Sequence, residues 1–147
     1  MEGINQGLTP DELVESVQLP ESLAGKDYLQ PFYGHPQWGI RSVFNGYLGW
    51  FDGNASNLFP LPPKAEAMRV AKLAGGTDKL LAAAKTALAE DDDQWAAQLA
   101  DHLLAINKDD SDAKQTKADA LTKLARKMVN ATARNYYLTV ARELREE

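Results

Sequence analysis

The chain has 147 residues, a formal net charge of −5 and a hydrophobic fraction of 44%. This length suits one domain, or one domain with an ordered arm. The negative charge argues against a general nucleic-acid binder, which needs a basic surface to neutralise phosphates. The absence of cysteine excludes disulfides, thiolate nucleophiles and cysteine zinc sites. No apolar stretch approaches the roughly 20 residues that span a bilayer, and the composition does not fix a compartment.

The composition changes sharply near the middle of the chain. All seven prolines lie at or before Pro63, all ten glycines lie at or before Gly76, and nine of the twelve aromatic residues precede residue 60. From Thr77 onward there is neither glycine nor proline, and alanine, leucine, lysine and aspartate dominate. Because glycine and proline interrupt helices, the sequence predicts an all-α protein in which an aromatic, turn-rich arm precedes a helical bundle.

The arm begins with a clear helix start. Thr9 is a good N-cap, Pro10 suits the first helical position, and two acidic residues follow where the helix dipole favours them. We expect this helix to end before Pro20, a short helical turn over 21–24, and irregular chain over 26–35.

A second arm helix is predicted from Pro36 to about Phe51, where Asp52-Gly53-Asn54 ends it. Its apolar positions would form one stripe, made of Trp38, Val43 or Phe44, Tyr47, and Trp50 or Phe51. A short arm has too little chain to bury all of its aromatic residues against itself. The pattern therefore indicates packing on the helical half and on a partner.

The second half is predicted to form five helices, over 64–74, 78–90, 92–106, 111–126 and 131–145. Thr77 and Ser111 are the expected N-caps of two of them, and Trp95 is expected in the core. Ala84 and Ala118 are 34 residues apart, which is the period of tetratricopeptide-like helix pairs. Two such pairs are too few for a free-standing stack, so the arm or another copy must cover them.

The sequence offers no catalytic or metal-binding constellation. His35 and His102 are far apart and lack neighbouring ligands, whereas catalytic zinc needs about three protein ligands. The three aspartates at 91–93 lack the spacing of a calcium loop and suit the acidic first turn of a helix. Arg41 leaves two alternatives open, an internal salt bridge or contact with an anion, and the salt bridge is favoured.

The run at 46–54, Gly-Tyr-Leu-Gly-Trp-Phe-Asp-Gly-Asn, is the most distinctive stretch of the chain. Together with the segments around it, this run resembles the alkyl sulfatase dimerisation domain, and the resemblance covers nearly the whole chain. The further matching segments are Tyr33-Gly34, Arg41-Ser42-Val43-Phe44, Leu58-Phe59-Pro60-Leu61, Gly75-Gly76, Gln94-Trp95-Ala96-Ala97, His102-Leu103-Leu104 and Arg134-Asn135-Tyr136-Tyr137-Leu138. Residues 7–13 and Leu19-Pro20 resemble the connecting segment of that family.

The resemblance implies a domain order and a parent activity. Residues 1–35 would be the connecting arm from an upstream metallo-β-lactamase-type domain, and 36–147 the dimerisation domain. The upstream domain would hydrolyse alkyl sulfates such as dodecyl sulfate with two zinc ions, and many members carry a sterol-carrier-like domain downstream. This chain would then hold no catalytic residue, metal or cofactor of its own.

The resemblance also implies roles for particular side chains. The chain would form a homodimer and wall the substrate pocket, with Arg41 and Tyr47 as pocket candidates. The expected dimer or arm packing residues are Trp38, Phe44, Trp50 and Phe51. Around His35 the sequence departs from the family pattern, so no pocket role is transferred to that histidine.

Two other classes of function compete with this interpretation. A tetratricopeptide-like peptide-binding adaptor would be a monomer with a polar concave face, whereas a dimerisation module needs a symmetric contact above about 1,000 Å². A stand-alone enzyme is disfavoured by the missing nucleophiles and metal ligands.

Overall fold

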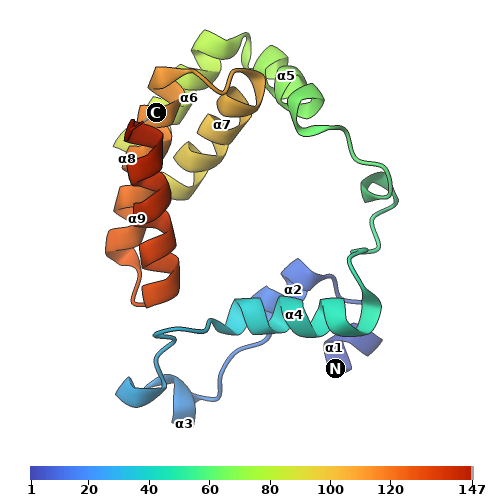
Figure 1. Cartoon of the computed structure of the whole chain (residues 1–147). Helices are drawn as coiled ribbons and strands as arrows, with labels where there is room; N and C mark the ends of the chain where they lie inside the picture. Colours follow the sequence, from blue (N-terminus) through green and yellow to red (C-terminus); the bar gives the residue numbers. More distant parts are fainter. Residues whose placement is uncertain (147) are drawn as a thin grey trace. The chain divides into compact units, whose positions relative to one another are not determined.

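The described part of the chain consists of helices joined by turns and irregular segments (Figure 1). A computed structural model describes residues 1–146, and these residues contain no β-strand, which confirms the predicted all-α class. Contacts divide the chain into two compact units, Met1–Pro60 and Leu61–Glu147. We call residues 1–60 the arm unit and residues 61–146 the helical unit. The predicted boundary between residues 35 and 36 concerns the longer protein and stays a prediction.

The arm unit consists of short helical segments joined by irregular chain. The predicted start of the first helix is confirmed, because the Thr9 hydroxyl accepts the Glu12 amide N–H while the Glu12 carboxylate accepts the Thr9 amide at 2.8 Å. The short turn expected over 21–24 is also present. The segments are α1 (Glu2–Asn5), α2 (Pro10–Ser16), α3 (Glu21–Ala24), the 3-10 turn η1 (Asp27–Leu29), α4 (Pro36–Leu48) and the 3-10 turn η2 (Ala55–Asn57).

The arm unit has a very small core. α2 packs on α4, and only Leu13 of α2 and Phe44 of α4 are buried within residues 1–60. Gly3 lets α1 approach α2 closely, because a Cβ atom at that position would lie 2.6 Å from Cδ2 of Leu13. Two buried side chains are few for a segment of this length, so the arm unit has little hydrophobic core of its own.

The predicted end of the second arm helix is wrong. α4 ends at Leu48 because Gly49 takes φ 79° and ψ −164°, a backbone region that essentially only glycine adopts. Trp50 and Phe51 therefore lie beyond the helix, and the predicted apolar stripe does not form one buried face. Trp38 and Tyr47 are exposed on α4, whereas Phe44 is buried.

The five predicted helices of the helical unit are confirmed to within two residues at each end. None of the helices over residues 1–146 is long and apolar enough to cross a membrane. Their bounds are α5 (Pro63–Ala74), α6 (Thr77–Ala89), α7 (Asp93–Ile106), α8 (Ser111–Lys127) and α9 (Ala131–Glu146).

Successive helices of the helical unit pack side by side. α7 contacts α6 and α8, α8 contacts α9, and the alternate pairs α5–α7 and α6–α8 also touch. Such contacts are expected of stacked helical hairpins, and the finer tetratricopeptide-like assignment stays a prediction. Small side chains let the helices approach closely. One cluster is centred on Ala96, Ala118 and Leu121, and the other on Leu80, Ala84 and Leu99.

Three local predictions in the helical unit are wrong. The N-cap of α8 is Asp110, whose carboxylate accepts the Ala113 amide at 3.0 Å, so Ser111 is the first helical residue. The N-cap of α6 is Gly76, and Thr77 is again the first helical residue. Trp95 is exposed, because the buried face of α7 is formed instead by Asp93, Ala96, Ala97, Leu99, Ala100 and Leu103.

Candidate assembly surface and apolar pockets of the arm unit

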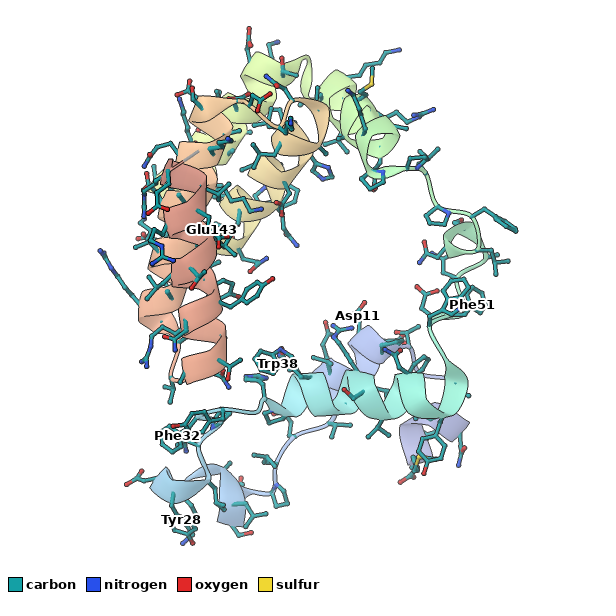
Figure 2. The ribbon with its side chains drawn as sticks, in the orientation of Figure 1. Asp11, Tyr28, Phe32, Trp38, Phe51 and Glu143 are labelled. Atoms are coloured by element: carbon teal, nitrogen blue, oxygen red, sulfur yellow. The ribbon has the colours of Figure 1, made fainter. Side chains whose placement is uncertain are left out.

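Most aromatic side chains of the arm unit are exposed. Phe59 is 93% exposed and Trp50 is 71% exposed. Figure 2 shows Tyr28 and Phe32 projecting from the segment between α3 and α4. Seven of the nine aromatic residues in this unit are exposed, so its surface carries the groups that protein interfaces favour. The seven are Tyr28, Phe32, Tyr33, Trp38, Tyr47, Trp50 and Phe59.

The structure brings some of the predicted packing residues together and separates one. The rings of Trp50 and Phe51 meet edge to face with centroids 5.7 Å apart, and Phe51 and Phe44 line the same pocket. Trp38 instead lies beside the His35 ring, at 5.8 Å between centroids. The assembly role of these residues stays a prediction.

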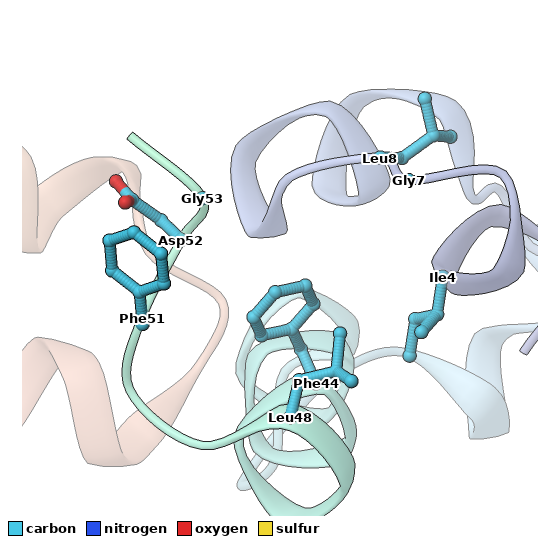
Figure 3. Close-up of a pocket in the computed structure, with 8 residues that line it drawn as sticks. All are labelled: Ile4, Gly7, Leu8, Phe44, Leu48, Phe51, Asp52 and Gly53. Carbon is cyan, nitrogen blue, oxygen red and sulfur yellow. The ribbon is translucent and has the colours of Figure 1, made fainter. Parts of the chain in front are cut away.

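The first pocket of the arm unit has a volume of about 300 Å³. Figure 3 shows Phe44 and Leu48 of α4 on one side of it and Ile4 of α1 on another. The wall is apolar except for Asp52 and the exposed backbone of the glycines. The full set of lining residues is Ile4, Gly7, Leu8, Phe44, Leu48, Phe51, Asp52 and Gly53.

Asp52 is the charged group at the edge of this pocket. Its carboxylate accepts the Asn54 amide N–H at 2.9 Å and the Asn57 side-chain amide at 2.6 Å. These two hydrogen bonds hold the pKa of Asp52 below its ordinary value, and the bond from the Asn54 amide has the larger effect. The carboxylate is therefore ionised at neutral pH and is used to fix the turn after α4, which leaves the pocket itself suited to an apolar group.

A second pocket, of about 340 Å³, lies between α1, α2 and α4. Its wall contains no charged side chain. The sequence-based reasoning missed both pockets, because they depend on α1 folding against residues about forty positions away. The lining residues are Met1, Ile4, Leu13, Val17, Pro36, Gly39, Ile40 and Val43.

The two predicted substrate-pocket residues line neither cavity. Arg41 forms a salt bridge with Asp11 of α2, which confirms the favoured alternative for this arginine. Tyr47 is exposed on α4. A substrate role for Arg41 and Tyr47 stays a prediction, because it depends on surfaces outside this chain.

The histidines occupy separate places that fit structural roles. His35 caps α4 by accepting the Gln37 amide N–H at 3.4 Å. His102 is half-buried and borders a concavity on α7 with Trp95, Gln98 and Asp101. Residues 1–146 contain no group of three or more His, Cys, Asp or Glu placed to hold a metal ion. The two zinc ions, which the resemblance implies for an upstream domain, stay a prediction.

Comparison with known proteins identifies the family. A family model described as alkyl sulfatase dimerisation matches residues 9–147. A linear primary-alkylsulfatase of Pseudomonas sp. is 44% identical over 142 residues, which are 96% of this chain and 27% of that protein. An alkyl/aryl-sulfatase of Saccharomyces cerevisiae is 34% identical over 143 residues, or 97% of this chain and 22% of that protein.

A solved alkylsulfatase structure has the same fold as this chain over the matched region. The stereoselective inverting sec-alkylsulfatase from Pseudomonas sp. superposes with a TM-score of 0.92 at 39% identity, over 98% of this chain and 23% of that chain. This chain thus spans about a quarter of the length of these relatives. The matches confirm the resemblance predicted from residues 46–54 and the segments around them. The chain belongs to the alkyl sulfatase dimerisation family.

Proposed function

We propose that this chain is the non-catalytic dimerisation portion of a longer alkylsulfatase and that it joins two copies of that protein. The observation that carries the proposal is the imbalance within the arm unit, where two side chains are buried and seven aromatic residues are exposed. A segment that leaves so much apolar surface in water is expected to bury it against another protein surface.

The exposed area is large enough to matter for assembly. Each buried aromatic side chain removes roughly 150–250 Å² from water. Because these seven side chains are on average about two-thirds exposed, covering all of them would remove roughly 700–1,200 Å² from water, which compares with about 800 Å² on each partner of a standard interface. The surface of the arm unit is therefore sufficient for a stable dimer contact.

The finer part of the proposal concerns the parent protein. Its relatives are named alkylsulfatases, and most of their length lies outside the matched region. We propose that an upstream metallo-β-lactamase-type domain with two zinc ions hydrolyses alkyl sulfates such as dodecyl sulfate. In the assembled protein, Arg41 and Tyr47 would face the substrate pocket, with the Arg41 guanidinium supplying positive charge toward a sulfate.

Sedimentation equilibrium of the 147-residue chain tests the dimerisation proposal. We expect a dimer at tens of micromolar, weakened in the variant Trp50→Ser/Phe59→Ser. The matched control is Trp95→Ser/Tyr136→Ser, which replaces two exposed aromatics of the helical unit and should leave the dimer intact. A monomeric wild-type chain at these concentrations would refute the proposal. If both variants weakened the dimer equally, the exposed aromatics of the arm unit would have no specific role in the dimer contact.

The catalytic part of the proposal needs the full-length protein. We expect dodecyl sulfate turnover that is lost on zinc chelation and restored by added zinc, and no turnover by the 147-residue chain alone. Turnover by the isolated chain would overturn the assignment of chemistry to the upstream domain. Chelator-resistant turnover by the full-length protein would exclude the zinc mechanism but not dimerisation.

The contacts between alternate helices, α5–α7 and α6–α8, support a second candidate, a tetratricopeptide-like peptide-binding adaptor. This adaptor would be monomeric and would bind peptides on the helical unit. The sedimentation experiment therefore separates the two candidates.

A further inference from the structure

The two units of the chain differ in net charge, which is negative for the arm unit and zero for residues 61–147. Residues 1–60 contain two basic and seven acidic residues, whereas residues 61–147 contain fourteen of each. The whole net charge of −5 is therefore carried by the arm unit. Charge is usually depleted at the centre of an interface, so an aromatic surface with this many acids needs a basic counterpart when it is covered.

Three of the seven acids of the arm lie beside exposed apolar groups in residues 15–28, which we call the acidic segment. Glu15, Glu21 and Asp27 are exposed, and no ion pair forms at any of the three within residues 1–146. Lys26 is the one cation of the segment. The large apolar side chains exposed among these acids are Val17, Leu19, Leu23 and Tyr28.

α5 presents the opposite combination. Figure 1 shows α5 at the edge of the helical unit, where it packs on α6 and α7 and buries Ala67 and Ala71. Its outer face exposes Leu73 at 89% and Met68 at 57%. α5 therefore exposes two large apolar side chains at the edge of the helix stack.

The cations of α5 surround these apolar side chains. Lys64 and Lys72 lie one turn before and one turn after Met68, so the three form a single row on the helix. Arg69 lies one turn before Leu73, and its guanidinium donates to the carbonyl of Ala65 at 2.7 Å. None of the three cations pairs with a carboxylate within residues 1–146. We call this outer face, made of Lys64, Met68, Arg69, Lys72 and Leu73, the basic α5 face.

We propose that the acidic segment of one copy docks on the basic α5 face of the second copy, an inference that rests on the dimerisation proposed above. Each surface has exposed apolar groups for affinity. The acidic segment has a net negative charge despite Lys26, and α5 has a net positive charge despite its exposed Glu66, so the two net charges are complementary. Charge complementarity of this kind fixes the register of an interface and raises the association rate. A two-fold axis would then repeat the contact, so each copy gives one acidic segment and receives one.

Two charge-reversal variants of the 147-residue chain test the contact. The first variant makes the acidic segment basic, with Glu15→Lys, Glu21→Lys and Asp27→Lys. The second makes the α5 face acidic, with Lys64→Glu, Arg69→Glu and Lys72→Glu. We expect each variant alone to dimerise at least tenfold more weakly than wild type at low salt, because like charges now face each other in both contacts.

Mixing the two variants gives the decisive result. In the mixed dimer, a basic segment meets an acidic α5 face, and an acidic segment meets a basic α5 face, so both contacts are again complementary. We expect native-like affinity for the mixture, measured by sedimentation with one variant fluorescently labelled. A contact formed inside one chain would not be rescued by mixing, so absence of rescue would overturn the inference.

Matched controls separate this inference from the proposed function. A variant with Lys108→Glu, Arg126→Glu and Arg134→Glu has the same change in charge as the second variant at exposed positions elsewhere, and should dimerise normally. A wild-type dimer that both reversal variants preserve would refute the docking while leaving the dimerisation function intact. A monomeric wild type would refute the dimerisation function itself and the docking with it.

Discussion

Lys127 Nζ lies 2.7 Å from Oδ2 of Asp93, a carboxylate that is completely buried at the start of α7. Lys123 Nζ lies 3.6 Å from the other carboxylate oxygen and also binds the Leu88 carbonyl at 2.8 Å. The ammonium groups are within ion-pair distance of Asp93, yet neither of its oxygens has a partner in hydrogen-bonding geometry. The two lysines of α8 therefore compensate the buried negative charge of Asp93 and hold the turn between α6 and α7 against α8.

Removing both lysines should destabilise the helical unit. The variant Lys123→Met/Lys127→Met leaves the Asp93 carboxylate buried without a counter-charge, and breaking a buried pair costs about 3–5 kcal/mol. Because the lysine side chains are 36% and 55% exposed, solvent screening reduces our expectation to about 2–3 kcal/mol in urea unfolding. Adding Asp93→Asn should recover part of this loss, because the uncompensated charge is then gone. A loss no larger than that of Lys108→Met would contradict the prediction.

The neighbouring pair of Asp91 and Lys123 predicts a pH dependence. A hydrogen bond from Lys123 at 2.7 Å holds the pKa of Asp91 below its ordinary value, and the same bond raises the pKa of Lys123. The contribution of this pair to the stability of the folded state is fully present above the unfolded pKa of Asp, about 3.9. It is lost as pH falls through the lowered pKa that Asp91 has in the folded state. At the alkaline end it is complete below the unfolded pKa of Lys, about 10.4, and is lost as pH rises through the raised value.

Titration of the Asp91 carboxyl carbon by NMR measures the acid side directly. We expect its pKa to rise toward the ordinary value in Lys123→Met. The pKa of Glu12 is lowered by hydrogen bonds to the backbone and hydroxyl of Thr9, so it should stay unchanged in this variant and serves as the internal control. An unchanged Asp91 titration would show that the Lys123 contact is absent in solution.

The two glycines on either side of the end of α4 should respond oppositely to alanine. Gly46 is helical with open space around its Cβ position, so Gly46→Ala should stabilise α4 by roughly 0.5–1 kcal/mol. Gly49 also has open space but takes φ 79° and ψ −164°, so Gly49→Ala should cost roughly 1–3 kcal/mol of backbone strain. Amide hydrogen exchange in α4 reports both changes, and effects of the same sign would refute the assigned helix end.

These two positions also show why one part of the fold could be predicted and another could not. The helical unit lacks glycine and proline after Gly76. No residue of these two types interrupts the helical periodicity there, so the periodicity predicted the bounds of the helices closely. In α4 the apolar pattern continues through Trp50 and Phe51 past the end of the helix. Periodicity does not report backbone dihedral angles, so it placed the end of α4 three residues too late.

Side-chain environment was harder to predict than helix position. Asp110 and Ser111 are both good N-caps, and only the geometry shows that Asp110 accepts the hydrogen bond. The apolar pockets depend on Ile4 folding back against α4, a long-range contact without a local signal. The exposure of Trp95 was missed for a related reason, since a large apolar residue on a helix indicates burial without saying which partner covers it.

Substitutions at the Arg41–Asp11 salt bridge separate a structural from a substrate role for Arg41. The two side chains are 46% and 79% exposed, so the pair is expected to contribute less than about 1 kcal/mol. Arg41→Ala and Asp11→Ala should therefore change the free energy of unfolding by similar small amounts. If Arg41 faces the sulfate in the full-length protein, only Arg41→Ala should lower kcat/KM for dodecyl sulfate, by about tenfold or more for a lost charge-assisted contact. Equal kcat/KM in the two variants would leave Arg41 with the salt bridge as its sole role.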